Sequence, residues 1–274
     1  MSQLNIKNII VGVDLSDYSK VVVKEAKNLA EHLDVPLIYV YAFEDNAVFS
    51  TSFSYEKPKL GEYYEKQVRQ KYRLNPQEKV IVRFGRPHTE IIETAKKYNK
   101  PMIIIGHKGR NPVVRLFIGS TAEQLALLSP FPTWIHRGPK KIIPKQILVP
   151  CDLSERSNHT IKGLNFFERK MASKIDLFHV FEEPTPLLDA QLYATVYSEM
   201  KKTDDQKVRN FRKKYPNLKT KSSLGPVADR IQDFAKKYDL IALSPRKHRN
   251  LSPYFGSVTT KVIRSGDKPV LVLP

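Results

Sequence analysis

The sequence is poor in cysteine, in acidic residues and in long apolar runs. Its one cysteine, Cys151, excludes a disulfide framework within the chain and a cluster of thiolate metal ligands, which fits a reducing compartment. No stretch approaches the ~20 apolar residues that a membrane-spanning helix needs. The first residues also lack the apolar run of a signal peptide. We therefore expect a cytoplasmic protein with no membrane partner.

Acidic residues are scarce relative to basic ones. The 274 residues contain 46 Lys and Arg against 28 Asp and Glu, a formal net charge of +18. Residues 1–138 carry 20 basic and 14 acidic residues, and residues 139–274 carry 26 and 14, so the excess lies mainly in the second half. A basic protein attracts nucleic acid, anionic lipid and phosphate ligands. A solvated lysine-rich surface explains the same charge, and we expect no dedicated nucleic-acid partner.

Short apolar runs alternate with segments of helical periodicity along residues 1–138. Each run reads as a buried strand, and each following segment repeats its apolar residues at helical spacing. Ser16 is predicted to be the N-cap of the first of these helices. This alternation predicts a parallel sheet with helices on both faces. The five predicted strands are Ile9–Val13, Leu37–Ala42, Lys79–Phe84, Met102–Ile105 and Pro132–His136. A helix is predicted from Tyr63 to Tyr72, after a loop from Glu44 to Gly61.

The pattern then restarts, which indicates an internal duplication. Ile147 to Ser154 repeats Ile9 to Ser16, and Ala235 to Tyr238 repeats the tetrapeptide at Ala95. The sequence thus predicts two α/β domains, residues 1–138 and 145–274, joined by a short linker. The second differs in its middle, where residues 188–215 favour a longer and more basic helix.

A glycine-punctuated loop follows the fourth strand. Gly106, Gly109, Gly119 and Ser120 form the pattern Gly-x2-Gly-x9-Gly-Ser between that strand and a helix. Glycine tolerates positive φ and lets a ligand approach closely, and the N-terminus of a helix attracts phosphate. Ser120 either caps this helix or donates its hydroxyl to a phosphate oxygen. A surface turn before a capped helix is the plainer interpretation of the same residues.

This spacing resembles the nucleotide loop of the universal stress protein family, in its ATP-binding branch. An Asp after the first strand is that family's other mark, and Asp14 supplies it here. The resemblance covers the whole chain as two copies. It implies two tandem doubly wound open parallel five-stranded sheets, Rossmann-like and adenine nucleotide alpha hydrolase-like, each with strand order 3-2-1-4-5. Ligands of such sheets bind beyond the carboxyl ends of the strands, where the order reverses.

The resemblance also assigns roles to residues. It places a backbone group near Val40 against adenine and Asp14 near the ribose or a metal such as Mg²⁺. Gly109, Gly119 and Ser120 would meet the phosphates, and Gly106 would give the turn its room. The residues that it implies for ATP are Asp14, Val40, Gly106, His107, Gly109, Arg110, Gly119, Ser120 and Thr121.

The second copy keeps the Asp, as Asp152, but departs from the loop pattern. Ser244 stands where Gly106 would, Lys247 stands roughly where Gly109 would, and Pro245 lies between them. Proline removes a backbone donor and fixes φ, so a phosphate cradle is disfavoured there. We expect one ATP per chain, bound in residues 1–138.

A tandem universal stress protein that senses or signals by a nucleotide-dependent shape change is therefore the predicted function. No residue is placed as a general base, so any ATP hydrolysis should be slow. Two alternatives remain: a basic RNA-binding protein, since Gly106 to Gly109 is also a basic Gly-x-x-Gly, and an interaction scaffold with a vestigial nucleotide site. The family commonly pairs through the fifth strand, which implies an intramolecular pseudo-dimer here, with a homodimer as the other arrangement. Trp134 and Leu271 lie in those apolar edge strands.

Overall fold

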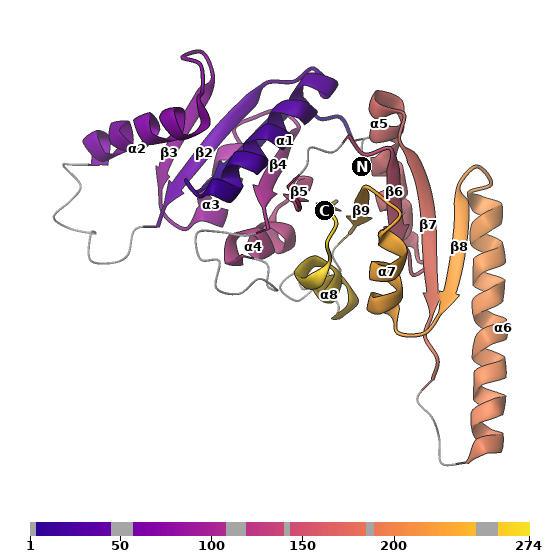
Figure 1. The fold of residues 1–274 in the computed structure, drawn as a ribbon. Coiled ribbons are helices and arrows are strands. Elements are labelled where there is room, and N and C mark those ends of the chain that lie inside the picture. The colour runs from indigo at the N-terminus through magenta and orange to yellow at the C-terminus, as the bar shows by residue number, and fades with distance from the viewer. Residues whose placement is uncertain (1–3, 45–56, 108–118, 140–142, 185–188, 245–256) are drawn as a thin grey trace.

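A computed structural model describes residues 4–44, 57–107, 119–139, 143–184, 189–244 and 257–274. Strands and helices alternate through both halves of the chain (Figure 1). The first half contains β1 (Asn8–Val13), α1 (Asp17–Leu33), β2 (Leu37–Phe43), α2 (Lys57–Tyr72), β3 (Lys79–Phe84), α3 (Pro87–Ala95), β4 (Pro101–Gly106), α4 (Ser120–Leu128) and β5 (Thr133–His136). The second half contains β6 (Gln146–Pro150), α5 (Glu155–Met171), β7 (Lys174–Phe181), α6 (Ala190–Lys214), β8 (Lys219–Leu224), α7 (Val227–Ala235), β9 (Leu240–Leu243), α8 (Ser257–Ser265) and β10 (Val270–Val272).

All five predicted strands of the first half are present, but one helix is longer than predicted. Helix α2 begins at Lys57, so the end of the segment expected to be a loop is helical, and residues 45–56 lie outside the described part. Pro58 lies in the first turn, where the missing N–H does not interrupt the helix. The long basic helix predicted for residues 188–215 is α6, which stands at the outer edge of the molecule (Figure 1).

The ten strands form one sheet in the order β3-β2-β1-β4-β5-β10-β9-β6-β7-β8. Each half has the order 3-2-1-4-5 that the resemblance implies, and the second half follows in reverse. Neighbouring strands within each half are parallel, whereas β5 and β10 are antiparallel, with Leu271 opposite Trp134. The two fifth strands thus turn two five-stranded sheets into one. Because the strand order of the second half is the reverse of the first and β5 and β10 are antiparallel, the two halves are related by a pseudo-two-fold axis.

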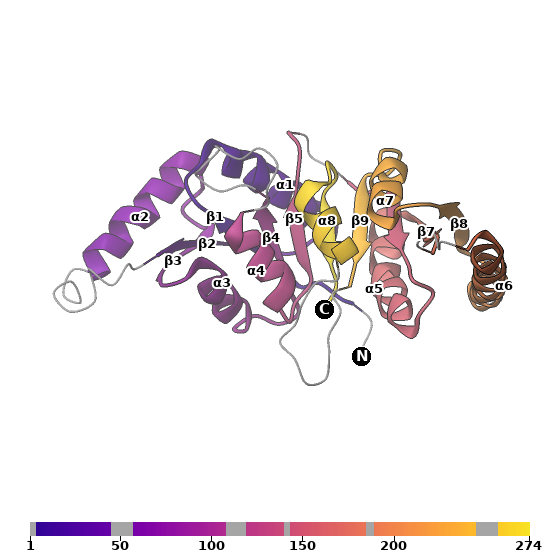
Figure 2. The same ribbon diagram turned by 90° about the horizontal axis from the view of Figure 1, so that it is seen from below.

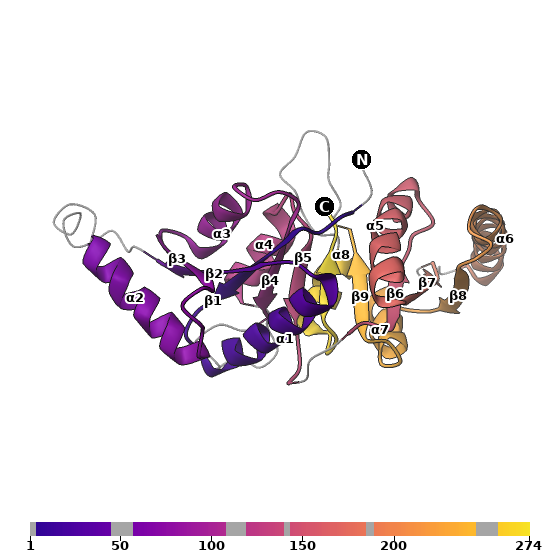
Figure 3. The ribbon, with the colours of Figure 1, turned by 90° about the horizontal axis from the view of Figure 1, so that it is seen from above.

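Helices cover both faces of this sheet. Helices α1 and α2 lie on one face of the first half, and α3 and α4 lie on the other (Figures 2 and 3). Each face has an apolar core that contains residues of both halves: Leu29 and Phe167 belong to one core, and Leu125 and Val262 to the other. Because apolar burial is the main favourable term in folding, these shared cores help to hold the halves together. No helix in the described residues is long and apolar enough to cross a membrane.

A buried arginine adds a polar contact between the halves. Arg137 follows β5, is only 5% exposed, and donates through its two Nη atoms to the carbonyl oxygens of Ile263 and Gly266. These carbonyls lie at the C-terminal end of α8, where a helix has unpaired acceptors and a negative dipole end. Burial lowers the pKa of Arg137 to about 10, so the guanidinium stays charged at neutral pH.

Replacing this arginine should destabilise the fold. Arg137→Met removes two charge-assisted hydrogen bonds and leaves buried carbonyls unpaired, so we expect the free energy of unfolding in urea to fall by about 3 kcal/mol. Arg264→Met is the matched control. That side chain is 47% exposed and pairs with Glu123 at 2.6 Å, so its loss should change stability by less than about 1 kcal/mol. Equal effects of the two variants would contradict the role given to Arg137.

Candidate functional site

The turn from β1 into α1 is organised by Asp14. Its Oδ1 accepts hydrogen bonds from the Ser16 backbone N–H at 3.0 Å and from the Ser19 hydroxyl at 2.5 Å. Ser16 is the N-cap of α1, as the sequence predicts, and its hydroxyl accepts from the Ser19 N–H. Leu15 has a left-handed φ of 64°, which a leucine adopts only when its surroundings hold it there. Asp14 is thus held at the carboxyl end of β1.

The second copy builds the same turn around Asp152. This carboxylate accepts from the Ser154 N–H at 3.1 Å, the Ser154 hydroxyl at 2.5 Å and the Ser157 hydroxyl at 3.3 Å, and Leu153 has a φ of 58°. Our sequence reasoning missed Ser19 and Ser157. The signal was present, because both copies read Asp-Leu-Ser-x-x-Ser.

Gly106 ends β4, the strand beside β1, so Gly106 and Asp14 lie at the same edge of the sheet. The sequence pattern predicts that this glycine allows a positive φ in the loop and lets a ligand approach. In the structure Gly106 is not among the described glycines with positive φ. A Cβ there would lie 3.0 Å from both Tyr18 Cε1 and Val22 Cγ2. Close packing against α1 is therefore a structural reason for glycine at this position.

His107 connects this edge to three other segments. Its Nδ1 lies 2.9 Å from the Tyr18 hydroxyl and 3.2 Å from the His136 carbonyl oxygen, to which that hydroxyl also donates. Its carbonyl oxygen accepts from the Gly119 N–H at 2.7 Å. The two ends of the glycine loop are therefore hydrogen-bonded to each other. Burial raises the pKa of Tyr18, which keeps its hydroxyl neutral and able to donate.

The far end of the loop leads into α4. Gly119, and not Ser120, is the N-cap of this helix, with φ −63° and ψ 144°, and no side chain caps it. Ser120 is exposed in the first helical position, and Thr121 follows. The prediction that Ser120 caps the helix is wrong, because the cap position lies one residue earlier. The Ser120 hydroxyl therefore lies at the N-terminus of α4, where the first N–H groups of a helix have no intrahelical partner.

The other predicted residues are placed less directly. Val40 lies in β2 between β1 and β3, fully buried and three residues before the strand ends. Gly109 and Arg110 lie outside the described residues, as does most of the loop. The structure thus brings together Asp14, Gly106, His107 and the start of α4. Among the described residues, no group of three His, Cys, Asp or Glu side chains could hold a metal ion.

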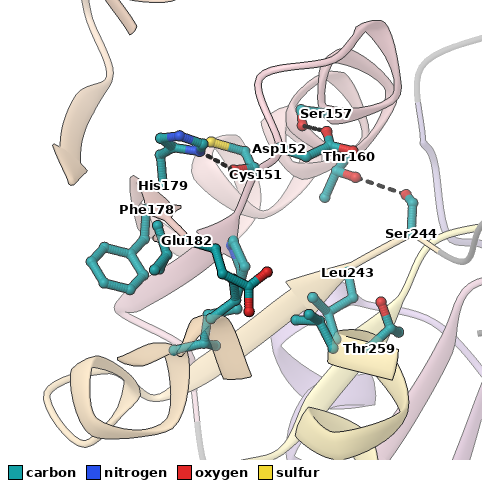
Figure 4. Close-up of a pocket in the computed structure, with 15 residues that line it drawn as sticks. Cys151, Asp152, Ser157, Thr160, Phe178, His179, Glu182, Leu243, Ser244 and Thr259 are labelled. Carbon is teal, nitrogen blue, oxygen red and sulfur yellow. Dashed lines mark hydrogen bonds between the residues drawn. The ribbon is translucent and has the colours of Figure 1, made fainter. Parts of the chain in front are cut away.

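A crevice of about 310 Å³ lies at the corresponding edge of the second copy (Figure 4). There the Thr160 and Ser244 hydroxyls point toward one another, 2.7 Å apart. These residues take the places of Val22 and Gly106, so a hydrogen bond replaces a close apolar contact. Phe178, the counterpart of Val40, stacks on Phe234 with 4.2 Å between ring centroids. The carboxyl edges of the two halves therefore differ in packing as well as in loop sequence.

Cys151 and His179 also line this second crevice. Cys151 is buried, and burial raises the pKa of its thiol to about 12. Cys151 is therefore a core residue and no nucleophile. His179 bonds to the Cys151 carbonyl oxygen at 3.0 Å and, through Nε2, to Asp204 at 2.7 Å. This buried pair ties α6 to β7.

These features define a class of protein: two tandem open α/β units, each with an Asp-centred turn at the carboxyl edge of its sheet. A model of the universal stress protein family matches residues 5–137 and again residues 144–274. The chain therefore belongs to the universal stress protein family, as a tandem member.

Individual relatives agree with this assignment. "Universal stress protein MJ0531" of Methanocaldococcus jannaschii is 24% identical over 143 residues, which are 49% of this chain and 84% of that protein. A universal stress protein structure from Archaeoglobus fulgidus has a TM-score of 0.68 at 19% identity, covering 99% of this chain and 98% of its own. A functionally unknown protein, PA1789 from Pseudomonas aeruginosa, has a TM-score of 0.66 at 15% identity, covering 98% and 92%. At these identities the two structures show the fold alone.

The difference in packing between the two carboxyl edges can be tested by placing the residue pair of the second half in the first half. Gly106→Ser should lower the free energy of unfolding by roughly 1–3 kcal/mol, because the added atoms crowd Tyr18 and Val22. Adding Val22→Thr should recover about 0.5–1.5 kcal/mol, because the two new hydroxyls can form a hydrogen bond like the one between Thr160 and Ser244. Gly61→Ser is the control, since nothing lies within 4 Å of a Cβ there. If the effects of Gly106→Ser and Val22→Thr on the free energy of unfolding in urea are strictly additive, the predicted hydrogen bond between them does not form.

A second prediction concerns acid stability. Burial lowers the pKa of His136 from 6.5 to about 4. The unfolded state therefore binds the proton first, and stability is lost as the pH falls from about 6.5 to about 4, by up to about 3 kcal/mol from this residue. Urea unfolding at several pH values should show a smaller loss in His136→Phe than in the unchanged protein. The exposed His32 provides the control, His32→Gln, and a loss identical in all three proteins would contradict the prediction.

Proposed function

We propose that this tandem universal stress protein binds ATP, with or without Mg²⁺, at the carboxyl edge of β1 and β4 in its first half. One observation carries the proposal: the Asp14 turn, the end of β4 and the start of α4 meet where the strand order reverses. Ligands of open α/β sheets bind at this position, and a helix N-terminus suits phosphate. Loop residues 108–118 belong to this proposal through the sequence pattern alone.

Nucleotide binding would act as a signal in the cytoplasm, with no catalytic residue assigned. Support comes from the contacts around the loop, because His107 joins it to Tyr18 of α1 and His136 of β5. Glu123 in the first turn of α4 pairs with Arg264 of α8, in the second half. A ligand that moves the start of α4 would therefore act on a helix of the other half. The RNA-binding alternative is weakened by β4, since a strand precedes the Gly-x-x-Gly, whereas the loop of KH domains joins two helices.

Calorimetry with the full-length chain tests the proposal. The isolated halves are unsuitable, because each would expose a fifth strand that is paired in the intact chain. We expect one ATP per chain, with and without Mg²⁺ as separate titrations. Gly119→Val should weaken binding at least tenfold, or about 1.4 kcal/mol. Its φ and ψ suit any residue, so the fold should stay intact.

Gly256→Val, at the sequence counterpart in the second half, is the matched control and should bind ATP like the unchanged chain. Absence of ATP binding would favour an interaction scaffold with a vestigial site. Two equivalent sites, or equal losses in the two variants, would show that the second half also binds.

A further inference from the structure

A cleft of about 820 Å³ lies between the two halves of the chain. The antiparallel pairing of β5 with β10 creates it, because the start of β5 lies beside the end of β10. Its walls come from the turns before β4 and β5, from the middle of α5 and from the residues after β10. Pockets between domains are common ligand sites, and this volume lies in their usual range.

The cleft is separate from the proposed ATP site. Pro101 lines it at the first residue of β4, whereas Gly106 ends the same strand. Five residue steps along a strand at 3.3 Å each separate the two positions by about 16 Å. A ligand in this cleft would therefore lie at the opposite edge of the first half.

Apolar and aromatic side chains form much of the wall. Tyr98 and Phe131 are half-buried on the first half, and Leu273 approaches from the second. Leu273 comes close to α5 because residue 163 is glycine, where a Cβ would lie 3.1 Å from Leu273 Cδ1. Glycine inside a helix costs about 1 kcal/mol relative to alanine, so this close contact has an energetic cost. The wall offers apolar surface to a compact hydrocarbon or aromatic group.

The polar side chains of the wall are positive or neutral. Lys100 and Lys162 reach the cleft from opposite halves, both exposed, and Asn5, Asn99 and Asn165 add amide groups. Among the described residues that line the cleft, none has an acidic side chain. An ammonium beside apolar walls favours a ligand with an apolar body and one anionic group.

We propose that this cleft binds a small amphipathic carboxylate, with its apolar body against Tyr98, Phe131 and Leu273 and its carboxylate near Lys100 and Lys162. The ligand would contact both halves at once, so binding would stabilise their mutual arrangement. This site and its ligand are independent of the ATP site.

Titration calorimetry of the full-length chain with octanoate tests the proposal, with octylammonium as the length-matched cation. We expect saturable octanoate binding, one per chain, and at least tenfold weaker binding of octylammonium. The double variant Lys100→Glu/Lys162→Glu should weaken octanoate at least tenfold. Lys170→Glu, an exposed change on α5 that does not line the cleft, should leave the affinity unchanged.

An occluding variant locates the ligand independently of charge. Asn99 is exposed at the mouth, so Asn99→Trp should fill the cleft without disturbing the core, and octanoate should bind at least tenfold more weakly. Circular dichroism confirms that each variant is folded. The proposal is overturned if octanoate does not bind saturably, if octylammonium binds as tightly, or if the double charge reversal behaves like Lys170→Glu.

Discussion

The antiparallel hydrogen bonding between β5 and β10 determines where the other features of the molecule lie. Strands within each half are parallel, so all their carboxyl ends share one edge, and the antiparallel pair turns the second half around. The carboxyl edges of the two halves consequently face in opposite directions. The cleft between the halves exists for the same reason, since the amino edge of one half meets the carboxyl edge of the other. Trp134 and Leu271, both fully buried, anchor the pair through apolar burial.

The pseudo-symmetry is broken at the residues that follow these strands. Arg137 after β5 binds the last carbonyls of α8, whereas its counterpart in the repeat is Pro274, which has no side-chain donor. The first half therefore holds a helix of the second half without an equivalent contact in return. The two carboxyl edges differ in the same way. The first has a close contact between Val22 and Gly106, and the second has a hydrogen bond between Thr160 and Ser244. Duplication supplied the fold twice, and single substitutions have made the two edges chemically different.

Part of the positive charge has a structural explanation at the ends of the sheet. Among the described strands, the two outermost, β3 and β8, have one neighbour each, and exposed strand edges invite pairing with other chains. Lys79 and Arg83 lie on β3, and Lys219 and Lys221 lie on β8. Residues 206–228 contain seven Lys and Arg and no acidic residue. Lysine on an edge strand discourages such pairing, so the charge helps to keep the long sheet from extending.

Sequence patterns predicted the local secondary structure well, but they did not predict contacts between residues far apart in the sequence. Runs of branched apolar residues identified the strands, and Ser16 was recognised as an N-cap because capping depends on neighbours in sequence. The packing of Gly106 against Tyr18 and Val22 was not predicted, since those residues are distant from it in sequence. The capping of α8 by Arg137 spans 126 residues or more and has no sequence signature. The phosphate role of Gly109 rests on the resemblance alone, because residues 108–118 lie outside the described part and only the two ends of the loop are described.

Those two ends connect the candidate nucleotide site to the rest of the molecule. His107 and Gly119 are hydrogen-bonded to each other, so the loop between them leaves and re-enters the sheet edge at nearly one point. The start of α4 follows at once, and its Glu123 pairs with Arg264 near the end of α8. At its other end, α8 contributes Val258 and Thr259 to the crevice of the second half. A chain of contacts through α4 and α8 therefore leads from the candidate nucleotide site to the crevice of the second half.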